Sequence, residues 1–272
     1  ARPQDELRCT FLSVGHGCAV LLETPGGRTI LYDAGRLGAP HRAAESISAA
    51  LWSRGTMHID AIVLSHADTD HFNAMPELLE RFSVGAVYVS PVMFEEEAPA
   101  LGVLTEAISR SGVPLAEIRA GDRLRTDDNC RIEVLHPPQR GVIGRDNANS
   151  LVLLVEYRGH TILLPGDLEP PGLSDLLAEE PVFCEILLVP HHGSSASNPV
   201  GLFDWARPRQ VVISGDRRSD TSGLEALCGR AGATLWHTAD CGAVTFRICG
   251  GSLKAAESVR VAPLQNLGKV VN

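Results

Sequence analysis

The sequence lacks the long apolar segments that mark membrane and secreted proteins. No apolar run approaches the roughly 18–20 residues that a membrane span needs, and short pieces such as residues 151–155 are the longest. No secretory signal pattern opens the chain. We therefore expect no membrane-spanning segment within these 272 residues, so that any contact with a membrane comes from segments outside this chain.

Motifs for several other chemistries are also missing. The seven cysteines form no Cys-x-x-Cys pair and no Cys/His zinc-finger spacing, so we interpret them mainly as small core residues. No Gly-x-Ser-x-Gly motif is present, which leaves a nucleophilic serine without support. The sequence contains neither an internal repeat nor a low-complexity segment. These absences disfavour a zinc finger, a serine-hydrolase elbow and a repeat array.

Positive charge is scarce, with 24 Lys and Arg residues against 33 Asp and Glu residues and a net charge of −9. Nonspecific nucleic-acid binders are usually basic, so this balance counts mildly against extended contact with DNA or RNA. Several of the acids are candidate metal ligands, however, and two divalent cations would cancel about four negative charges at one site. The hydrophobic content of 44% is typical of a soluble globular protein.

Short apolar segments and turn signals predict the order of strands and helices. Strands are expected at residues 10–14, 19–24, 29–33, 59–64, 86–90, 150–157, 161–164, 186–189, 210–214 and 243–248, with short ones near 115, 132 and 235. Helices are expected at residues 42–54, 75–82, 98–109, 199–205 and 224–231. Hairpins followed by strand–helix alternation, twice over, predict an α+β fold in which two mixed sheets pack face to face with helices outside, an αββα four-layer sandwich. We expect one domain over residues 1–250 and a weakly structured C-terminal tail over residues 251–272.

The densest group of metal-competent side chains directly follows the apolar run at residues 59–64. His66, Asp68, Asp70 and His71 fall within six residues. A strand that ends here and turns into a helix can aim all four side chains into one cup at the edge of a sheet. Two imidazoles and two carboxylates so close together repel and desolvate one another unless cations lie among them. The pattern therefore predicts a metal site, in preference to a polar loop that contains two histidines by chance.

Three other apolar strands end on residues of the same kind. These residues are Asp33, Asp167 and the pair His191 and His192. Each alone has a simpler explanation: Asp167 as a turn former, the histidine pair as incidental, and Asp33 as a cap of the turn before Gly35. Together they repeat one pattern, in which an apolar strand is followed by a small residue and then by a metal-competent side chain. This favours a shared metal site, and its nitrogen and oxygen ligands suit two divalent ions. The histidines at positions 16, 41, 58, 136, 160 and 237 lack this order and are expected to be structural or solvent-exposed.

These motifs together resemble the metallo-β-lactamase superfamily, and within it the β-lactamase-like domain of the ComEC/Rec2 competence proteins. The resemblance extends over about residues 8–248 and rests on residues 11–17, 24–27, 31–35, 66–71, 147–153, 166–167 and 189–194. It implies an αββα sandwich with a dinuclear metal site at the edge of the two sheets. By position, His66 and Asp68 would hold one ion, Asp70 and His71 the other, and Asp167 would bridge them.

The resemblance leaves parts of the ligand set open. His192 or His191 would complete a shell, with a preference for His192 because it directly precedes Gly193. The superfamily usually has a further histidine, in its third motif, where this chain has residues 145–149. Asp146 or an asparagine amide would take its place, or the position would be open. Asp33 would support the site from outside the ligand set. Because Asp68 stands where most of the superfamily has histidine, the site is oxygen-rich, which favours Mn²⁺ or Mg²⁺ without excluding Zn²⁺.

Two segments depart from the branch. Gly15-His16-Gly17-Cys18 stands where the branch usually has Gly-Gln-Gly-Asp, and residues 216–221 stand where it commonly has Gly-His-Pro. The second change removes a histidine that would contact the substrate or leaving group. Arg217 and Arg218 are candidate phosphate contacts in its place.

The resemblance implies a metal-dependent hydrolase of phosphodiesters, the DNA nuclease domain of a competence-type uptake protein. Asp70, Asp167 and His191 would take the catalytic roles, with two divalent ions as cofactors. The expected partner is DNA, single-stranded or one strand of a duplex, and no obligate protein partner is evident. We expect a bacterial protein, on the extracytoplasmic face of the membrane if it is part of a ComEC-like protein and otherwise soluble in the cytoplasm. The alternatives are a small-molecule ester, phosphoester or lactone hydrolase of the same fold, and a degenerate domain that binds DNA or a partner without catalysis.

Overall fold

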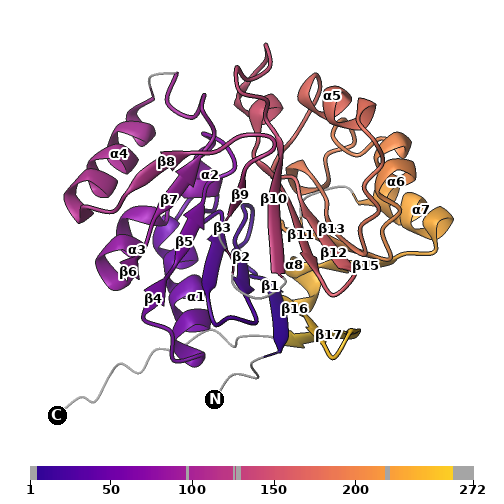
Figure 1. Cartoon of the computed structure of the whole chain (residues 1–272), viewed down its shortest axis with the longest axis horizontal. Coiled ribbons are helices and arrows are strands. Elements are labelled where there is room, and N and C mark those ends of the chain that lie inside the picture. Colours follow the sequence, from indigo (N-terminus) through magenta and orange to yellow (C-terminus); the bar gives the residue numbers. More distant parts are fainter. Residues whose placement is uncertain (1–4, 96–97, 125, 127–129, 218–220, 260–272) are drawn as a thin grey trace.

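Two mixed β-sheets pack face to face in the computed structural model, and helices cover the outer face of each sheet (Figure 1). The structure describes residues 5–95, 98–124, 126, 130–217 and 221–259. The predicted αββα four-layer arrangement is confirmed. Among the helices of the described residues, none is both long and apolar enough to cross a membrane.

The first sheet has eight strands in the order β17-β16-β1-β2-β3-β5-β7-β8. Its strands are β1 (Glu6–Phe11), β2 (Val20–Glu23), β3 (Thr29–Tyr32), β5 (Ala61–Val63), β7 (Val87–Val89), β8 (Leu115–Glu117), β16 (Ala243–Cys249) and β17 (Ser252–Val259). Strands β3, β5, β7 and β8 run parallel, and the others pair antiparallel. The helices α1 (Pro40–Ser53), α3 (Met75–Arg81) and α4 (Pro99–Ser111) cover its outer face, beside the two-stranded ribbon of β4 (His58–Ile59) and β6 (Ser83–Val84).

The second sheet has seven strands in the order β15-β14-β13-β12-β11-β10-β9. They are β9 (Arg123–Leu124), β10 (Cys130–His136), β11 (Val152–Tyr157), β12 (His160–Leu164), β13 (Ile186–Leu188), β14 (Gln210–Ile213) and β15 (Thr234–His237). The helices α5 (Gly172–Ala178), α6 (Val200–Ala206) and α7 (Ser222–Ala231) lie on its outer side, and the short α8 (Thr238–Cys241) leads back to the first sheet. Both sheets combine hairpins with parallel strands, as the alternation in the sequence predicts.

The main hydrophobic core lies between the two sheets. Its largest buried side chains include Phe11, Tyr32, Tyr157 and Phe246. The rings of Phe11 and Phe246 meet edge to face with centroids 6.0 Å apart, a favoured aromatic geometry. The Tyr32 hydroxyl donates a hydrogen bond of 2.7 Å to the Leu151 carbonyl, so the buried phenol is satisfied across the sheet interface.

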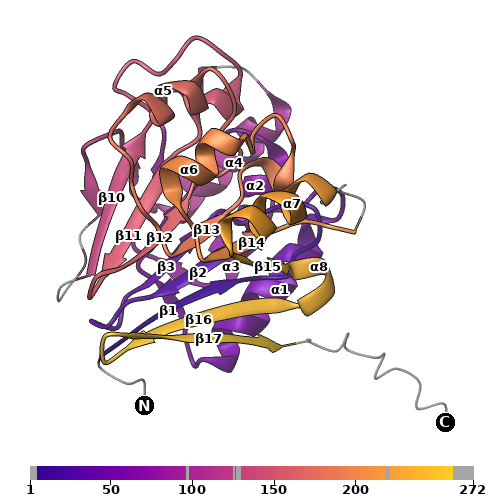
Figure 2. The same ribbon diagram turned by 90° about the vertical axis from the view of Figure 1, so that its right-hand side faces the viewer.

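The segment assigned from the sequence to a C-terminal tail begins as a strand. Ser252–Val259 form β17, which pairs antiparallel with β16 along the edge of the first sheet (Figure 2). Gly250 and Gly251 have φ angles of 60° and 76°, the left-handed conformations that a two-residue hairpin turn requires. Leu253 packs against the core between the sheets. Residues 252–259 of the segment expected to be a weakly structured tail therefore belong to the first sheet. Residues 260–272 lie outside the described residues.

Strand ends from both sheets meet at one edge of the sandwich, where two glycines let loops approach the first turn of α2 (Thr69–Phe72). A Cβ atom on Gly35 would lie 2.5 Å from the carbonyl carbon of Asp70 and 2.7 Å from the His71 nitrogen. A Cβ on Gly17, whose φ is +145°, would lie 2.7 Å from the Asp70 oxygen. Cys18 N–H donates to the Asp70 carbonyl, and Gly35 N–H donates to the Cys18 carbonyl. Small residues are therefore required here to hold Asp70 and His71 in place.

We predict that Gly35→Ala destabilises the protein, because the added methyl group pushes against the backbone of α2. Overpacking of this kind costs about 1–3 kcal/mol in the free energy of unfolding. Gly102→Ala in α4 is the matched control, because its Cβ would meet nothing within 4 Å. Alanine is the better helix former, so this control should gain about 0.5–1 kcal/mol. Denaturant unfolding of both variants measures the difference, and equal stability of the two would contradict the close approach.

Candidate metal centre

His71 lies at the centre of the site, fully buried between two carboxylates. Its Nδ1 lies 2.8 Å from Asp33 Oδ2, and its Nε2 lies 3.2 Å from Asp167 Oδ1. The short helix α2 presents the ring inward, and Asp167 reaches it from the end of β12 in the opposite sheet. One imidazole thus joins the two halves of the sandwich.

Asp33 links His71 to the loop that follows β5. Its carboxylate accepts hydrogen bonds from the Ser65 N–H at 2.7 Å and from the Ser65 hydroxyl at 2.8 Å, in addition to facing His71. Its φ of 58° is unusual for a residue with a side chain and turns the carboxylate back beneath the loop that follows β5. Asp33 therefore contacts His71 Nδ1, on the side of the ring away from Asp167.

His66 and Asp68 form one side of the site. His66 is buried, with its Nδ1 2.8 Å from the Ser65 hydroxyl and its Nε2 3.5 Å from Asp68 Oδ2. Asp68 is the residue before α2, and its side chain is 51% exposed. Burial raises the pKa of Asp68, but hydrogen bonding to His66 outweighs this and lowers it overall.

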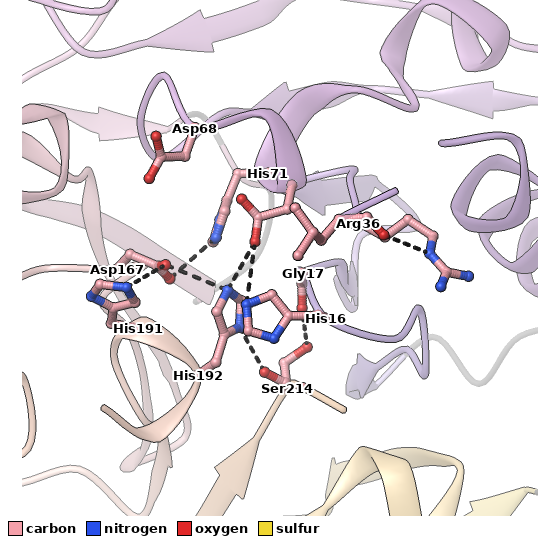
Figure 3. A network of polar contacts seen from close by, with 12 residues as sticks. His16, Gly17, Arg36, Asp68, His71, Asp167, His191, His192 and Ser214 are labelled. Carbon is pink, nitrogen blue, oxygen red and sulfur yellow. Dashed lines mark hydrogen bonds and ion pairs between the residues drawn. The ribbon is translucent and has the colours of Figure 1, made fainter. Parts of the chain in front are cut away.

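Asp70, Asp167 and His192 form the other side. His192 Nε2 lies 3.2 Å from Asp70 Oδ2 and 3.4 Å from Asp167 Oδ2, while its Nδ1 lies 2.8 Å from the Ser214 carbonyl. Figure 3 shows the rings of His71 and His192 converging beside Asp167. Asp167 thus lies between the two rings, with Oδ1 toward His71 and Oδ2 toward His192.

The carboxylates of the site are held ionised by these imidazoles. Burial alone would raise the pKa of Asp167, but the charges of His71 and His192 hold that pKa well below its usual range. Burial likewise opposes ionisation of Asp70, yet hydrogen bonding to His192 and the charge of His71 lower its pKa to about 2. Among the described residues, the negative charges of Asp70 and Asp167 are therefore balanced by the neighbouring histidines.

The donors fit divalent metal ions. His66 Nε2 is buried and makes no hydrogen bond among the described residues, and the buried His71 Nε2 faces only the Asp167 carboxylate there. Buried polar atoms of this kind are costly unless another species binds them. Ligand atoms of His66, His71 and Asp167 all lie within 4.8 Å of one another, as do those of His16, Asp70 and His192. Both groups offer only imidazole nitrogens and carboxylate oxygens, which are ligands of Zn²⁺, Mn²⁺ and Mg²⁺. Two adjacent ion sites are compatible with this arrangement.

The geometry favours His192 over His191 as a ligand. His191 is 36% exposed, and its Nε2 lies 4.0 Å from Asp167 Oδ2, with its Nδ1 3.5 Å from Glu169. His191 and His192 have φ angles of 51° and 50°, two consecutive left-handed residues. Backbone strain of this kind persists where the surroundings enforce it and is common at functional sites. Here it turns His192 inward and leaves His191 at the rim.

His16 is the site residue that the sequence reasoning missed. It was expected to be structural or solvent-exposed, but its Nε2 lies 4.0 Å from Asp70 Oδ2 and its ring lies 4.4 Å from that of His192. The expectation failed because His16 follows no apolar strand end and instead lies in the loop between β1 and β2. The glycines on both sides of it were the available signal, since they permit a tight loop against the site.

Three other predicted residues lie outside this cluster or outside the described chain. Asp146 begins a 3₁₀ helix, η1 (Asp146–Asn149), and belongs to neither group of converging donors among the described residues. Arg217 is 73% exposed, and its Nε lies 3.0 Å from Asp240, so in this structure its charge is paired on the surface. Arg218 lies outside the described residues.

A pocket of about 540 Å³ opens beside the cluster, a volume in the range of small-ligand sites. Its lining includes three histidines of the site and three serines: His16, His191, His192, Ser194, Ser195 and Ser222. The donors of the cluster can therefore be reached by a ligand from this side.

Comparison with known proteins identifies the fold and its relatives. The model of the metallo-beta-lactamase superfamily matches residues 13–198. The chain is 31% identical over 170 residues to ComE operon protein 3 of Bacillus subtilis, covering 62% of this chain and 21% of that protein. It is 28% identical over 261 residues to competence protein ComA of Neisseria gonorrhoeae, covering 94% of this chain and 34% of that protein. The chain thus spans about a fifth to a third of the length of these relatives, and the resemblance predicted from its motifs is confirmed.

A solved structure shares the fold at low identity. The CmlA beta-hydroxylase E377D mutant superposes with a TM-score of 0.57 at 15% identity, covering 91% of this chain and 54% of that one. At this identity the likeness concerns the fold alone.

We predict that metal binding to this site releases protons and strengthens as the pH rises. Burial lowers the pKa of His71, but Asp167 and Asp33 raise it well above its usual value, so the metal-free imidazole is protonated near pH 7. A metal ion that binds His71 Nε2 must displace this proton. For each proton released, the apparent affinity for the metal rises by up to about tenfold per pH unit while the pH is below the pKa of His71. Chelator competition at several pH values, with calorimetry in buffers of different ionisation enthalpy, measures both effects. An affinity that does not change with pH would contradict the proposed displacement.

Proposed function

Because the chain belongs to the metallo-beta-lactamase superfamily, we propose that it is a two-metal phosphodiesterase that hydrolyses DNA. The observation that carries the proposal is the pair of donor groups beside Asp167, one with His66 and Asp68 and the other with Asp70 and His192. The buried His71 lies against Asp167 itself. Two ions bridged by a carboxylate are suited to the displacement of a phosphodiester leaving group.

The proposed ions are Mn²⁺ or Zn²⁺, with Mg²⁺ as a further candidate. His66, Asp68 and Asp167 would hold one ion, and Asp70, His71, His192 and Asp167 the other. Such ions activate water at neutral pH and offset charge on the phosphoryl oxygens. The carboxylates Asp68, Asp70 and Asp167 make the donor set rich in oxygen, which supports Mn²⁺ more than an all-histidine set would.

The residues of the chain would position the phosphate. His191 lies at the rim of the site with a side chain that is 36% exposed, so its imidazole is within reach of a phosphoryl oxygen. The left-handed backbone at His191 and His192 directs the His192 ring to the proposed metal ion and the His191 ring to the substrate side. Arg217 would have to leave Asp240 to reach a substrate, and Arg218 remains a candidate contact.

DNA is proposed as the substrate because one of the relatives is named as a competence protein. If this chain is likewise one domain of a larger uptake protein, it would act on the extracytoplasmic face of a bacterial membrane, on a single strand or one strand of a duplex. A small ester is the second candidate, since the pocket beside the site has the volume of a small-ligand site.

The loop at residues 137–146 supports a polymeric substrate. It follows β10, which runs in the same direction as β12, so the loop lies at the same edge as Asp167. The side chain of Asn149 clamps it, accepting from Val142 N–H at 2.6 Å and donating to the Val142 carbonyl at 2.9 Å. At its tip Ile143 is 99% exposed. A rigid loop with an exposed apolar tip is the kind of element that contacts unstacked bases.

Two arginines flank this tip. Arg140 and Arg145 are both exposed, and neither guanidinium has a carboxylate partner among the described residues. Unpaired positive charge is notable in a chain with a net charge of −9. Phosphate groups on either side of a base that contacts Ile143 would pair with these arginines.

The decisive test is hydrolysis of labelled single-stranded and double-stranded DNA by metal-stripped protein resupplied with Mn²⁺, Mg²⁺ or Zn²⁺. We expect metal-dependent cleavage that falls by about 100-fold or more in Asp70→Ala, because several kcal/mol of charge stabilisation are lost. Asp204→Ala on the exposed side of α6 is the matched control and should cleave at the normal rate. Binding of two metals without DNA cleavage would favour the small-ester alternative, and absence of metal binding would favour a non-catalytic binding domain.

We predict that Arg140→Ala/Arg145→Ala weakens single-stranded DNA binding and makes it less sensitive to salt. Loss of two phosphate contacts reduces the slope of log affinity against log salt by about 1.4. Hydrolysis of bis(p-nitrophenyl) phosphate should be unchanged, because that ester is too small to reach the loop. Arg110→Ala on α4, where the arginine pairs with Glu106, is the control. An unchanged salt slope in the double variant would exclude the loop from the DNA path.

A further inference from the structure

His16 is fixed against the proposed metal centre by its backbone neighbours. Gly15 and Gly17 have φ angles of +96° and +145°, which turn the loop tightly around it. The His16 carbonyl accepts a hydrogen bond from Leu37 N–H at 2.6 Å, and the Gly17 carbonyl accepts one from the Ser214 hydroxyl at 2.8 Å. The loop is therefore anchored to both halves of the sandwich, and the imidazole is held at the rim of the site.

The His16 ring converges on the same carboxylate oxygen as His192. His16 Nε2 lies 4.0 Å from Asp70 Oδ2, and His192 Nε2 lies 3.2 Å from that oxygen. Figure 3 shows the two rings side by side, facing the same point. Two ligands of one ion can lie at most about 4.2 Å apart when each bond is about 2.1 Å. The distances from Asp70 Oδ2 to His16 Nε2 and to His192 Nε2 are both within that limit.

All the histidines of the cluster share one orientation. His66, His71 and His192 each present Nε2 to the centre of the site and Nδ1 to an oxygen behind the ring. His16 follows the same rule, with Nε2 toward Asp70 and Nδ1 4.0 Å from Asp216 Oδ1. Metal-binding histidines commonly use the second ring nitrogen in this way, because the outer oxygen fixes the ring.

We infer that His16 is an additional ligand of the ion held by Asp70 and His192. The inference rests on the proposed metal centre and deepens it, since it makes the two ion positions chemically unequal. The position at His66 and Asp68 is rich in oxygen. The position at Asp70 gains a further imidazole, which suits Zn²⁺ and other late transition metals more than Mn²⁺ or Mg²⁺. Mixed occupancy by two different metals follows from this asymmetry.

His16→Gln tests the assignment, because glutamine keeps a polar side chain of similar length and removes the imidazole. His58→Gln is the matched control, since His58 is exposed on β4, at the opposite end of the strands from the site. The readouts are the number of bound ions, their dissociation constants for Zn²⁺ and Mn²⁺ by chelator competition, and the visible spectrum of the Co²⁺-loaded protein. None of these depends on catalysis.

In His16→Gln we expect at least about tenfold weaker Zn²⁺ binding at one of the two positions, since even outer partners of metal ligands contribute 10–100-fold. The Co²⁺ spectrum should change, Mn²⁺ binding should change less, and His58→Gln should match the unmodified protein. Equal Zn²⁺ constants and an identical Co²⁺ spectrum in His16→Gln would overturn the inference and leave His16 as a wall of the pocket. If the unmodified protein binds no metal, the proposed function fails first, so the two failures are distinguishable.

Discussion

The carboxylate of Asp33 is the interaction on which the site depends. It receives two hydrogen bonds from Ser65 and faces His71, and all three residues are fully buried. A buried carboxylate is tolerated only when its oxygens are satisfied, so the end of β3, the loop after β5 and the helix α2 are held in one arrangement. The position of His71 follows from this, and through His71 so does that of Asp167 in the other sheet.

The balance of charge in the site extends this constraint. Asp33, Asp70 and Asp167 lie close together, and the histidines among them keep the pKa values of Asp70 and Asp167 low. The structure is therefore organised around a small volume in which cations are needed, in a chain that is acidic overall. Divalent cations bound here would cancel part of the net charge of −9, so that charge is a weak argument against a polyanionic substrate.

Much of the fold and of this site could be predicted from the sequence, because both depend on local patterns. The apolar strands that end in Asp33, His66, Asp167 and His192 were recognisable, and parallel strands bring such ends to one edge. The superfamily resemblance gave the layer arrangement.

The rest depended on contacts that no local pattern encodes. His16 lies in a loop whose place is set by long-range hydrogen bonds to Leu37 and Ser214. The strand β17 was missed although its Gly-Gly turn was visible, because its polar residues resemble a tail. Arg217 looked free in the sequence, yet Asp240 lies beside it only after the last helices have folded. Ligands at strand ends are thus readable from sequence, whereas residues delivered by loops are not.

The pairing of β1 with β16 has a consequence for how the chain is made. Glu6 pairs with Cys249, so β1 acquires one of its two neighbours only after about 240 further residues have been synthesised. At a synthesis rate of about 5–20 residues per second, that edge of β1 remains open for roughly 10–50 seconds. An unpaired strand edge is a template for wrong pairing. Nascent chains are therefore more exposed to wrong pairing at β1 before the β16–β17 hairpin emerges, and this hairpin protects the edge of β1 as well as extending the first sheet.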